Sequence, residues 1–126
     1  MYVIKMKKIL LVEDHPAAIE LIQQELQFLG YASVVAKDGH EAIEMAVSQE
    51  PDLIIMDISL PKLNGLEATA RIREFPGLKS TPVLAVTARA LPGDQQLCFL
   101  AGCNDYIPKP FTHRELRQAI RRLLKD

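Results

Sequence analysis

The chain has 126 residues, of which 48% are hydrophobic and 25% are charged, and its formal net charge at pH 7 is -1. This composition is ordinary for one globular domain, and the near-neutral charge gives no general reason to expect binding to nucleic acid or a membrane surface. No apolar run approaches the roughly 20 residues of a membrane span, and residues 1–8 are too short and too poorly patterned for a signal peptide.

The two cysteines, Cys98 and Cys103, are too few for a disulfide framework, so we expect small buried thiols in a reducing compartment. A cytoplasmic location follows as the expectation. No internal repeat, low-complexity tract or linker-like segment divides the chain, so residues 1–126 are expected to form a single domain.

The first part of the chain alternates short apolar runs with segments of helical periodicity. A strand is predicted at Lys8–Val12, and the helix after it is predicted to end at Gly30. The apolar face of that helix carries Ala18, Ile22, Leu26 and Leu29. The next strand is predicted at Ser33–Ala36, followed by a helix that stops before Pro51. The apolar face of this second helix carries Ala42, Ile43, Ala46 and Val47.

The same alternation continues through the middle of the chain. A strand is predicted at Leu53–Met56, and the helix that follows Gly65 is predicted to end near Pro76–Gly77. Its apolar positions are Leu66, Ala70 and either Ile72 or Arg73. A further strand is predicted at Pro82–Val86, before a helix between Pro92 and Gly102. That helix is predicted to bury Leu97, Leu100 and Ala101.

The last two elements are a strand at Asp105–Ile107 and a helix that opens with a capping box at Thr112–Glu115. The predicted buried face of this helix carries Leu116, Ile120, Leu123 and Leu124. Its other face is basic, with Arg114, Arg117, Arg121, Arg122 and Lys125. We interpret the basic residues as a solvated face, or alternatively as a contact with a partner or a second copy.

Strands that alternate with helices predict an α/β fold, in which a doubly wound parallel sheet is covered by helices on both faces. The middle strands lack in–out polar alternation, as burial on both faces requires. In sheets of this kind the crossovers are right-handed, and sites form beyond the carboxyl ends of the strands. The residue that ends each strand therefore matters most for function.

Polar side chains lie at the ends of four of the predicted strands. The first strand ends in Glu13-Asp14, the third in Asp57 and the fourth in Thr87-Ala88, and the fifth is followed by Lys109-Pro110. Three carboxylates on one rim repel one another unless a cation is present, and Mg²⁺ suits such a set of oxygen ligands. Asp57 is the acid best placed to act as a nucleophile that accepts a phosphoryl group, because its strand is expected to be central.

Each of these residues also has a plainer interpretation. Asp57 alone could cap a helix or begin a turn, and Glu13-Asp14 could merely favour the start of the helix near Pro16. Thr87 could be an ordinary strand residue, and Tyr106 could serve only in packing. The combination at successive strand ends favours a phosphoryl-transfer site.

Two rival kinds of site fit the sequence less well. Flavin or nucleotide binding requires a phosphate loop rich in Gly, Ser or Thr, whereas the first strand is followed by Glu13-Asp14-His15. A hydrolase with an aspartate nucleophile would typically carry a second Asp two residues after Asp57, where this chain has Ser59. The three histidines, His15, His40 and His113, have no metal-ligand spacing.

The whole pattern resembles the receiver domain of bacterial two-component response regulators. The resemblance is carried by Glu13-Asp14, Asp57 with Leu60-Pro61 and Gly65, Thr87-Ala88, and Lys109-Pro110-Phe111, and it runs from about Lys7 to Lys125. It implies a flavodoxin-like strand order, 2-1-3-4-5. It also implies a signalling phosphoacceptor that catalyses only its own phosphoryl transfer and dephosphorylation, and is otherwise not an enzyme.

The resemblance implies a role for each site residue. Asp57 would accept a phosphoryl group from a phosphohistidine on a sensor histidine kinase or a histidine phosphotransfer domain. Asp14, Asp57 and the backbone carbonyl of Ser59 would ligate Mg²⁺ directly, and Glu13 would act through a bound water. Lys109 would pair with the phosphoryl group.

The resemblance also implies a conformational switch. Thr87 would swing toward the phosphoryl group, Tyr106 would turn inward behind it, and a downstream effector protein would read the Tyr106 face. The Lys109-Pro110 bond would be a cis peptide, and Ala88 would keep the entrance to the phosphoacceptor open. Ser59 and Arg89 occupy positions that tune the lifetime of the phosphoryl group in this family.

Three alternatives stay open at this point. The chain could be a stand-alone switch, which the opening Met1–Met6 favours, or a receiver excised from a hybrid histidine kinase, which Thr87–Phe111 resembles. It could instead be a pseudo-receiver that only binds proteins, although the intact acid set argues against this. No direct contact with nucleic acid or membrane is expected, and the oligomeric state is expected to be a monomer or weak dimer.

Overall fold

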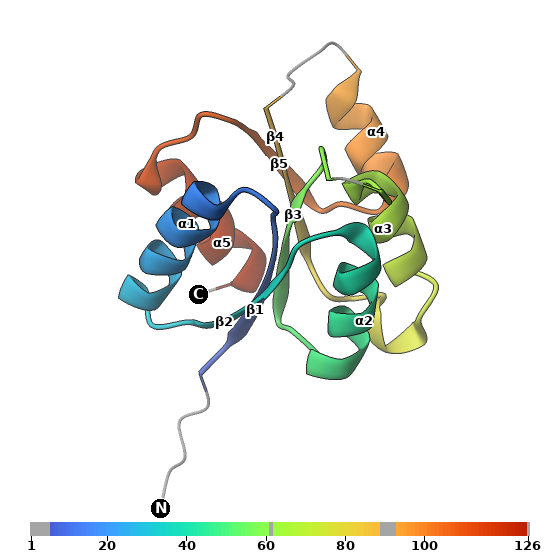
Figure 1. The fold of residues 1–126 in the computed structure, drawn as a ribbon, viewed down its shortest axis with the longest axis horizontal. Helices are drawn as coiled ribbons and strands as arrows, with labels where there is room; N and C mark the ends of the chain where they lie inside the picture. The colour runs from blue at the N-terminus through green and yellow to red at the C-terminus, as the bar shows by residue number, and fades with distance from the viewer. Residues whose placement is uncertain (1–5, 61, 89–92, 126) are drawn as a thin grey trace, which may run out of the picture.

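The computed structural model describes residues 6–60, 62–88 and 93–125. Over these residues strands and helices alternate along the chain, as predicted (Figure 1). The elements are β1 (Lys8–Val12), α1 (Pro16–Phe28), β2 (Ala32–Ala36), α2 (Gly39–Gln49), β3 (Leu53–Asp57), α3 (Gly65–Ile72), the 3-10 turn η1 (Pro76–Leu78), β4 (Val83–Thr87), α4 (Asp94–Ala101), β5 (Asp105–Pro108) and α5 (His113–Leu124). No helix in these ranges is both long enough and apolar enough to span a bilayer.

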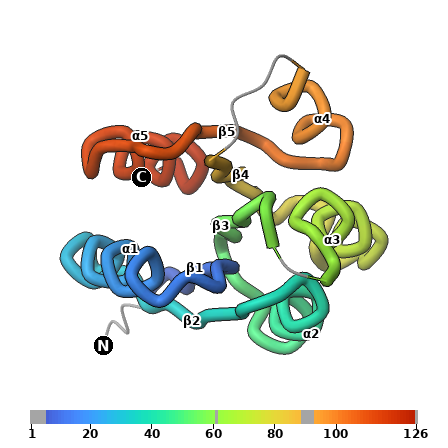
Figure 2. Tube along the Cα trace, turned by 45° about the horizontal axis from the view of Figure 1, so that its top comes forward, coloured from blue at the N-terminus to red at the C-terminus, as the bar shows by residue number. Residues whose placement is uncertain are grey.

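The strands form one parallel sheet in the order β2-β1-β3-β4-β5, which confirms the predicted doubly wound fold and its strand order. Figure 2 shows α1 and α5 together on one face of the sheet, and α2, α3 and α4 on the other. The crossovers therefore place every helix against the sheet and every strand's carboxyl end at one edge.

The two helical layers share the sheet because successive strand residues point to opposite faces. Leu10 and Met56 pack in the core beneath α2, α3 and α4, whereas Ile9 and Ile55 pack in the core beneath α1 and α5. All five residues of β3 are buried. Burying one large aliphatic side chain contributes about 1.5–3 kcal/mol, so the central strand is firmly held in the sheet.

Two strand ends bear on the site. Asp57 is the last residue of β3 and Thr87 the last residue of β4, one residue beyond the apolar run of each strand. The ladder still holds the chain just beyond Asp57, because the Ile58 N–H donates to the Val86 carbonyl at 3.0 Å. Both polar side chains are therefore fixed by strand pairing rather than by a loop.

The predicted apolar faces of three helices were partly wrong. The exposed fractions of Val47, Leu97 and Leu100 are 46%, 52% and 83%, and Ala70 is also exposed. Small side chains face the sheet instead, among them Ala46, Ala68 and Cys98. Cys98 and Cys103 are free, buried thiols, as predicted.

Gly65, the first residue of α3, lies against the end of β3. A Cβ atom at this position would be 2.3 Å from the carbonyl oxygen of Asp57, so no other residue fits without displacing the strand. The Gly65 N–H also donates to the Ile58 carbonyl at 3.1 Å. The start of α3 is thereby packed directly on the backbone that carries Asp57.

Arg73, just after α3, ties that helix to two loops. Its Nη1 donates to the carbonyls of Leu78 and Thr81 at 2.7 and 2.6 Å. Its Nε and Nη2 donate to the Gly102 carbonyl at 3.1 and 2.9 Å, and Nη2 donates to Asn104 Oδ1 at 2.7 Å. One guanidinium thus holds four acceptors on the α3–β4 and α4–β5 connections.

We predict that Arg73→Ala lowers the free energy of unfolding by about 2–4 kcal/mol, because hydrogen bonds to a charged group are lost and their acceptors are left without a partner. The matched control is Arg71→Ala on the same helix, where the side chain is exposed and the change should stay within about 0.5 kcal/mol. Urea denaturation followed by circular dichroism measures both. Equal midpoints for the two variants would contradict this assignment.

Candidate functional site

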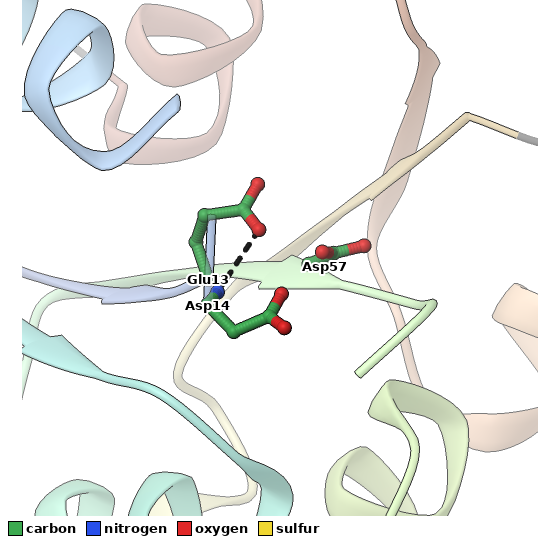
Figure 3. Close-up of side chains that lie close together, drawn as sticks. All are labelled: Glu13, Asp14 and Asp57. Carbon is green, nitrogen blue, oxygen red and sulfur yellow. Dashed lines mark hydrogen bonds between the residues drawn. The ribbon is translucent and has the colours of Figure 1, made fainter. Parts of the chain in front are cut away.

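The carboxyl ends of β1 and β3 bring the predicted acids together. Glu13 and Asp14 follow β1, Asp57 ends β3, and Figure 3 shows their side chains gathered at this edge of the sheet. Glu13 is 2% and Asp57 6% exposed, whereas Asp14 is open to solvent. Thr87, at the end of neighbouring β4, is 2% exposed. The site therefore has a buried floor and one solvent-facing carboxylate.

The acids have the chemistry and spacing of a cation site. Glu13, Asp14 and Asp57 each offer a carboxylate oxygen, and these oxygens all lie within 4.8 Å of one another. Hard divalent cations such as Mg²⁺ take carboxylate and carbonyl oxygens together with waters. Ser59, the expected carbonyl ligand, lies beside them, and its N–H donates to Asp57 Oδ1 at 3.0 Å. The donor set fits Mg²⁺.

Lys109 reaches this cluster from the connection between β5 and α5. Its Nζ lies 2.7 Å from Glu13 Oε1 and 3.9 Å from Asp57 Oδ2, so its closer partner in this structure is Glu13. Its own N–H donates to the Thr87 carbonyl at 2.7 Å, and the Lys109-Pro110 peptide is cis, as the resemblance implied. The direct pairing of Lys109 with Glu13 was not predicted from the sequence.

Burial and crowding perturb the two inner carboxylates in opposite directions. Burial and the neighbouring Glu13 raise the pKa of Asp57 from 3.8 to about 6, against the opposing effects of Ser59 and Lys109. Burial also tends to raise the pKa of Glu13, but hydrogen bonds from Lys109 and Asp57 outweigh it and hold that pKa below its ordinary value. Opposite pKa shifts in adjacent carboxylates are typical of functional sites, where the two groups have different roles.

Thr87 and Tyr106 lie on the same face of the sheet. Tyr106 pairs with Ala85 across the β4–β5 ladder, two residues before Thr87 on β4. Tyr106 is half-buried against the core beneath α2, α3 and α4, and burial raises the pKa of its phenol. The movements expected of these two side chains stay predictions, and Arg89 lies outside the described residues.

Sequence reasoning missed an ion-pair cluster between α1 and α5. Glu25 is 8% exposed, and its carboxylate lies 2.7 Å from Arg117 Nη2 and 3.1 Å from His113 Nδ1. Part of the basic face of α5 is therefore an internal contact rather than a solvated surface. The sequence does contain a sign of this cluster, because the acid Glu25 lies among the apolar positions Ile22 and Leu26 of the first helix.

A groove of about 560 Å³ opens beside the acid cluster, between α1 and the β5–α5 connection. Its walls are mostly apolar and include Leu21, Ile22 and Phe111, while Ala88 and Lys109 lie at the end next to the site. An apolar surface thus borders the acid cluster on the side of Lys109.

Comparison with known proteins decides the family. The profile of the response regulator receiver domain matches residues 9–121. The chain belongs to this family. It is 36% identical over 120 residues to the polar-differentiation response regulator DivK of Brucella anthropi, and the match covers 95% of this chain and 98% of DivK.

The relatives include parts of longer proteins. The chain is 37% identical over 119 residues to PhoP of Bacillus subtilis, an alkaline phosphatase synthesis transcriptional regulatory protein, but this match covers 94% of the chain and 49% of PhoP. The chain therefore spans about half the length of that relative.

Solved receiver structures superpose closely on this fold. The receiver domain of the sensor histidine kinase PA1611 from Pseudomonas aeruginosa is 40% identical, with a TM-score of 0.90 over 97% of this chain and all of that domain, and it has a magnesium ion coordinated in its active site cleft. Chemotaxis response regulator CheY4 of Vibrio cholerae is 30% identical, with a TM-score of 0.89 over 94% of this chain and 99% of CheY4. This receiver domain is therefore a module of two-component signalling.

The raised pKa of Asp57 predicts an unusual pH dependence of stability. The folded receiver binds a proton more tightly at Asp57 than the unfolded chain does, so stability falls as pH rises from 3.8 to about 6. Asp57→Asn removes this effect. In chelator-treated protein at neutral pH it should raise the free energy of unfolding by about 1–3 kcal/mol.

Urea denaturation of both proteins across this pH range measures the difference, which should shrink toward zero at acidic pH. An Asp57→Asn variant less stable than the parent at neutral pH would show that the Asp57 carboxylate is not destabilising. Asp52→Asn, at an exposed residue before β3, provides the control for the chemistry of the substitution.

Proposed function

We propose that this receiver is a phosphoacceptor switch of a two-component system or phosphorelay, in which Asp57 takes a phosphoryl group from a phosphohistidine. The observation that carries the proposal is the placement of Asp57 at the buried end of the central strand, beside a second acid and within 3.9 Å of the Lys109 ammonium. A nucleophilic carboxylate, a cation site and a fixed positive charge are the parts that phosphoryl transfer needs.

In the proposed step, a carboxylate oxygen of Asp57 attacks the phosphorus atom. A P–O bond forms as the P–N bond to the donor imidazole breaks, and the electron pair of that bond leaves on nitrogen. Asp14, Asp57 and the Ser59 carbonyl would hold Mg²⁺, with Glu13 contributing through water. When bound, Mg²⁺ would neutralise charge on the carboxylates and the phosphoryl oxygens. Lys109 would leave Glu13 and pair with the phosphoryl group.

The phosphoryl group of the product carries roughly -1.5 to -2 charges at the end of β3, where the free Asp57 carboxylate carried one. Thr87 ends the neighbouring strand and can donate its hydroxyl to the new acceptor oxygens. Its displacement would leave space on the face that it shares with Tyr106, and Tyr106 would turn inward. The proposed output is thus a rearrangement of β4, α4 and β5.

Partners follow from the surfaces near these elements. The phosphodonor, a sensor histidine kinase or histidine phosphotransfer domain, would dock on the apolar groove beside Lys109. A downstream effector protein would read the Tyr106 face, where Leu97 and Leu100 of α4 are exposed. We propose a monomer or weak dimer without direct binding to nucleic acid or membrane. We also propose a cytoplasmic location, which the two free thiols favour.

We further propose that residues 1–126 form a single receiver domain whose only catalysis is its own phosphoryl transfer and dephosphorylation. The similarity to DivK supports a response regulator. The similarity to the PA1611 receiver supports the alternative, a receiver that belongs to a histidine kinase. The site chemistry is the same in both cases.

Incubation with Mg²⁺ and acetyl phosphate is predicted to add one phosphoryl group, detected by intact mass. Asp57→Asn is the matched control and should gain none, and omission of Mg²⁺ should also prevent the addition. If beryllofluoride with Mg²⁺ left the amide spectrum around Asp57 unchanged and no adduct formed, the chain would be a pseudo-receiver that acts only through protein binding.

Thr87→Ala tests the switch separately from the chemistry. The variant should still bind beryllofluoride at Asp57, but NMR shifts at Tyr106 and along β5 should be much smaller than in the parent, because the linking hydroxyl is absent. Thr87→Ser keeps the hydroxyl and should restore the shifts. Full Tyr106 shifts in Thr87→Ala would show that the signal leaves the site by another route.

A further inference from the structure

The segment between β3 and α3 is closed at its base by backbone contacts between Gly65 and the end of β3. This segment begins after Asp57 and carries Ser59, the residue expected to offer a carbonyl to the cation. At its two ends, the Gly65 N–H donates to the Ile58 carbonyl at 3.1 Å, and Gly65 packs on the carbonyl of Asp57. The position of Gly65 therefore fixes the end of this segment against the end of β3.

The carbonyl of Gly65 is held in turn by a side chain one turn further along α3. Thr69 Oγ1 donates to it at 2.8 Å, and the Thr69 side chain is 0% exposed. The same hydroxyl oxygen lies 4.0 Å from Cys103 Sγ, whose thiol donates to it. A continuous buried chain thus runs from Cys103 through Thr69 and Gly65 to the backbone beside Asp57.

Helix stability alone does not explain a hydroxyl at this position. A threonine that bonds back to the carbonyl four residues earlier slightly destabilises a helix, and a buried hydroxyl must find a partner. Ala68 and Ile72, the neighbouring residues buried with Thr69 on α3, are apolar. We therefore expect the hydroxyl to stabilise the position of Gly65, whose carbonyl accepts its hydrogen bond.

We propose that Thr69 is a positioning residue for phosphoryl transfer, because its buried hydroxyl fixes Gly65 and thereby the segment that brings Ser59 to the cation site. This inference rests on the proposed function. Thr69 touches neither the cation ligands nor the phosphoacceptor. It acts through the Gly65 carbonyl and the Gly65–Ile58 hydrogen bond.

The first test uses chelator-treated protein, so it does not depend on activity. In Thr69→Val, which keeps the shape of the side chain and removes the hydroxyl, hydrogen exchange of the Gly65 amide should accelerate about fivefold, the change that loss of one net hydrogen bond produces. Thr69→Ser keeps the hydroxyl and should restore protection. Ile72→Val, a buried one-methyl deletion on the same helix, is the control for general loosening of α3.

The second test measures Mg²⁺ affinity by NMR titration of the parent and the same variants. Thr69→Val should weaken binding about fivefold, whereas Thr69→Ser and Ile72→Val should stay within about twofold. Thr69→Ala provides a second hydroxyl deletion, with no branched side chain to accommodate, if the valine variant does not fold.

The outcomes separate the two proposals. If the parent binds Mg²⁺ but the hydroxyl deletions match Ile72→Val in Gly65 exchange and in affinity, Thr69 is only a packing residue and this inference is overturned. If the parent itself binds no Mg²⁺, the proposed function fails, and the positioning role fails with it. If Thr69→Val and Thr69→Ala lose Gly65 protection and Mg²⁺ affinity while Thr69→Ser keeps both, the inference is supported.

Discussion

Mutual repulsion between carboxylates is the constraint around which this receiver is organised. Parallel strands bring Glu13, Asp14 and Asp57 to one edge, and two of these acids are almost completely buried. Lys109 offsets part of the charge by pairing with Glu13 at 2.7 Å, and the pKa of Asp57 still rises to about 6. Crowding these carboxylates lowers the stability of the fold, and the firmly packed centre of the sheet offsets that loss.

The surroundings of the cluster are built to prevent the acids from moving apart. Gly65 packs on the Asp57 carbonyl, and the Ile58 N–H continues the ladder to β4. Both contacts are made by backbone atoms, and the first requires that residue 65 has no side chain. Hydrogen-bonded backbone near a charged site is a common means of preorganisation, because it needs no rearrangement when charge changes.

The sequence was sufficient for the fold and for which side chains meet, because strand periodicity and strand-end acids are local signals. It was insufficient where tertiary packing decides. Leu97 and Leu100 have helical spacing, yet the smaller Cys98 faces the sheet. The Glu25–Arg117 pair joins residues far apart in the chain, and the Lys109–Glu13 pair depends on a distance that spacing along the chain does not contain.

The strand order separates two mechanical requirements. Asp57 lies on β3, which has paired neighbours on both sides and is buried at every position, so displacing it would disrupt both cores. Tyr106 lies on β5, a four-residue strand at the margin of the sheet with a single neighbour and incomplete burial. Local free energies of opening are lowest where buried contacts are fewest. The interior strand β3 thus keeps the acid cluster in place, whereas β5 at the margin of the sheet can move at a lower cost in free energy.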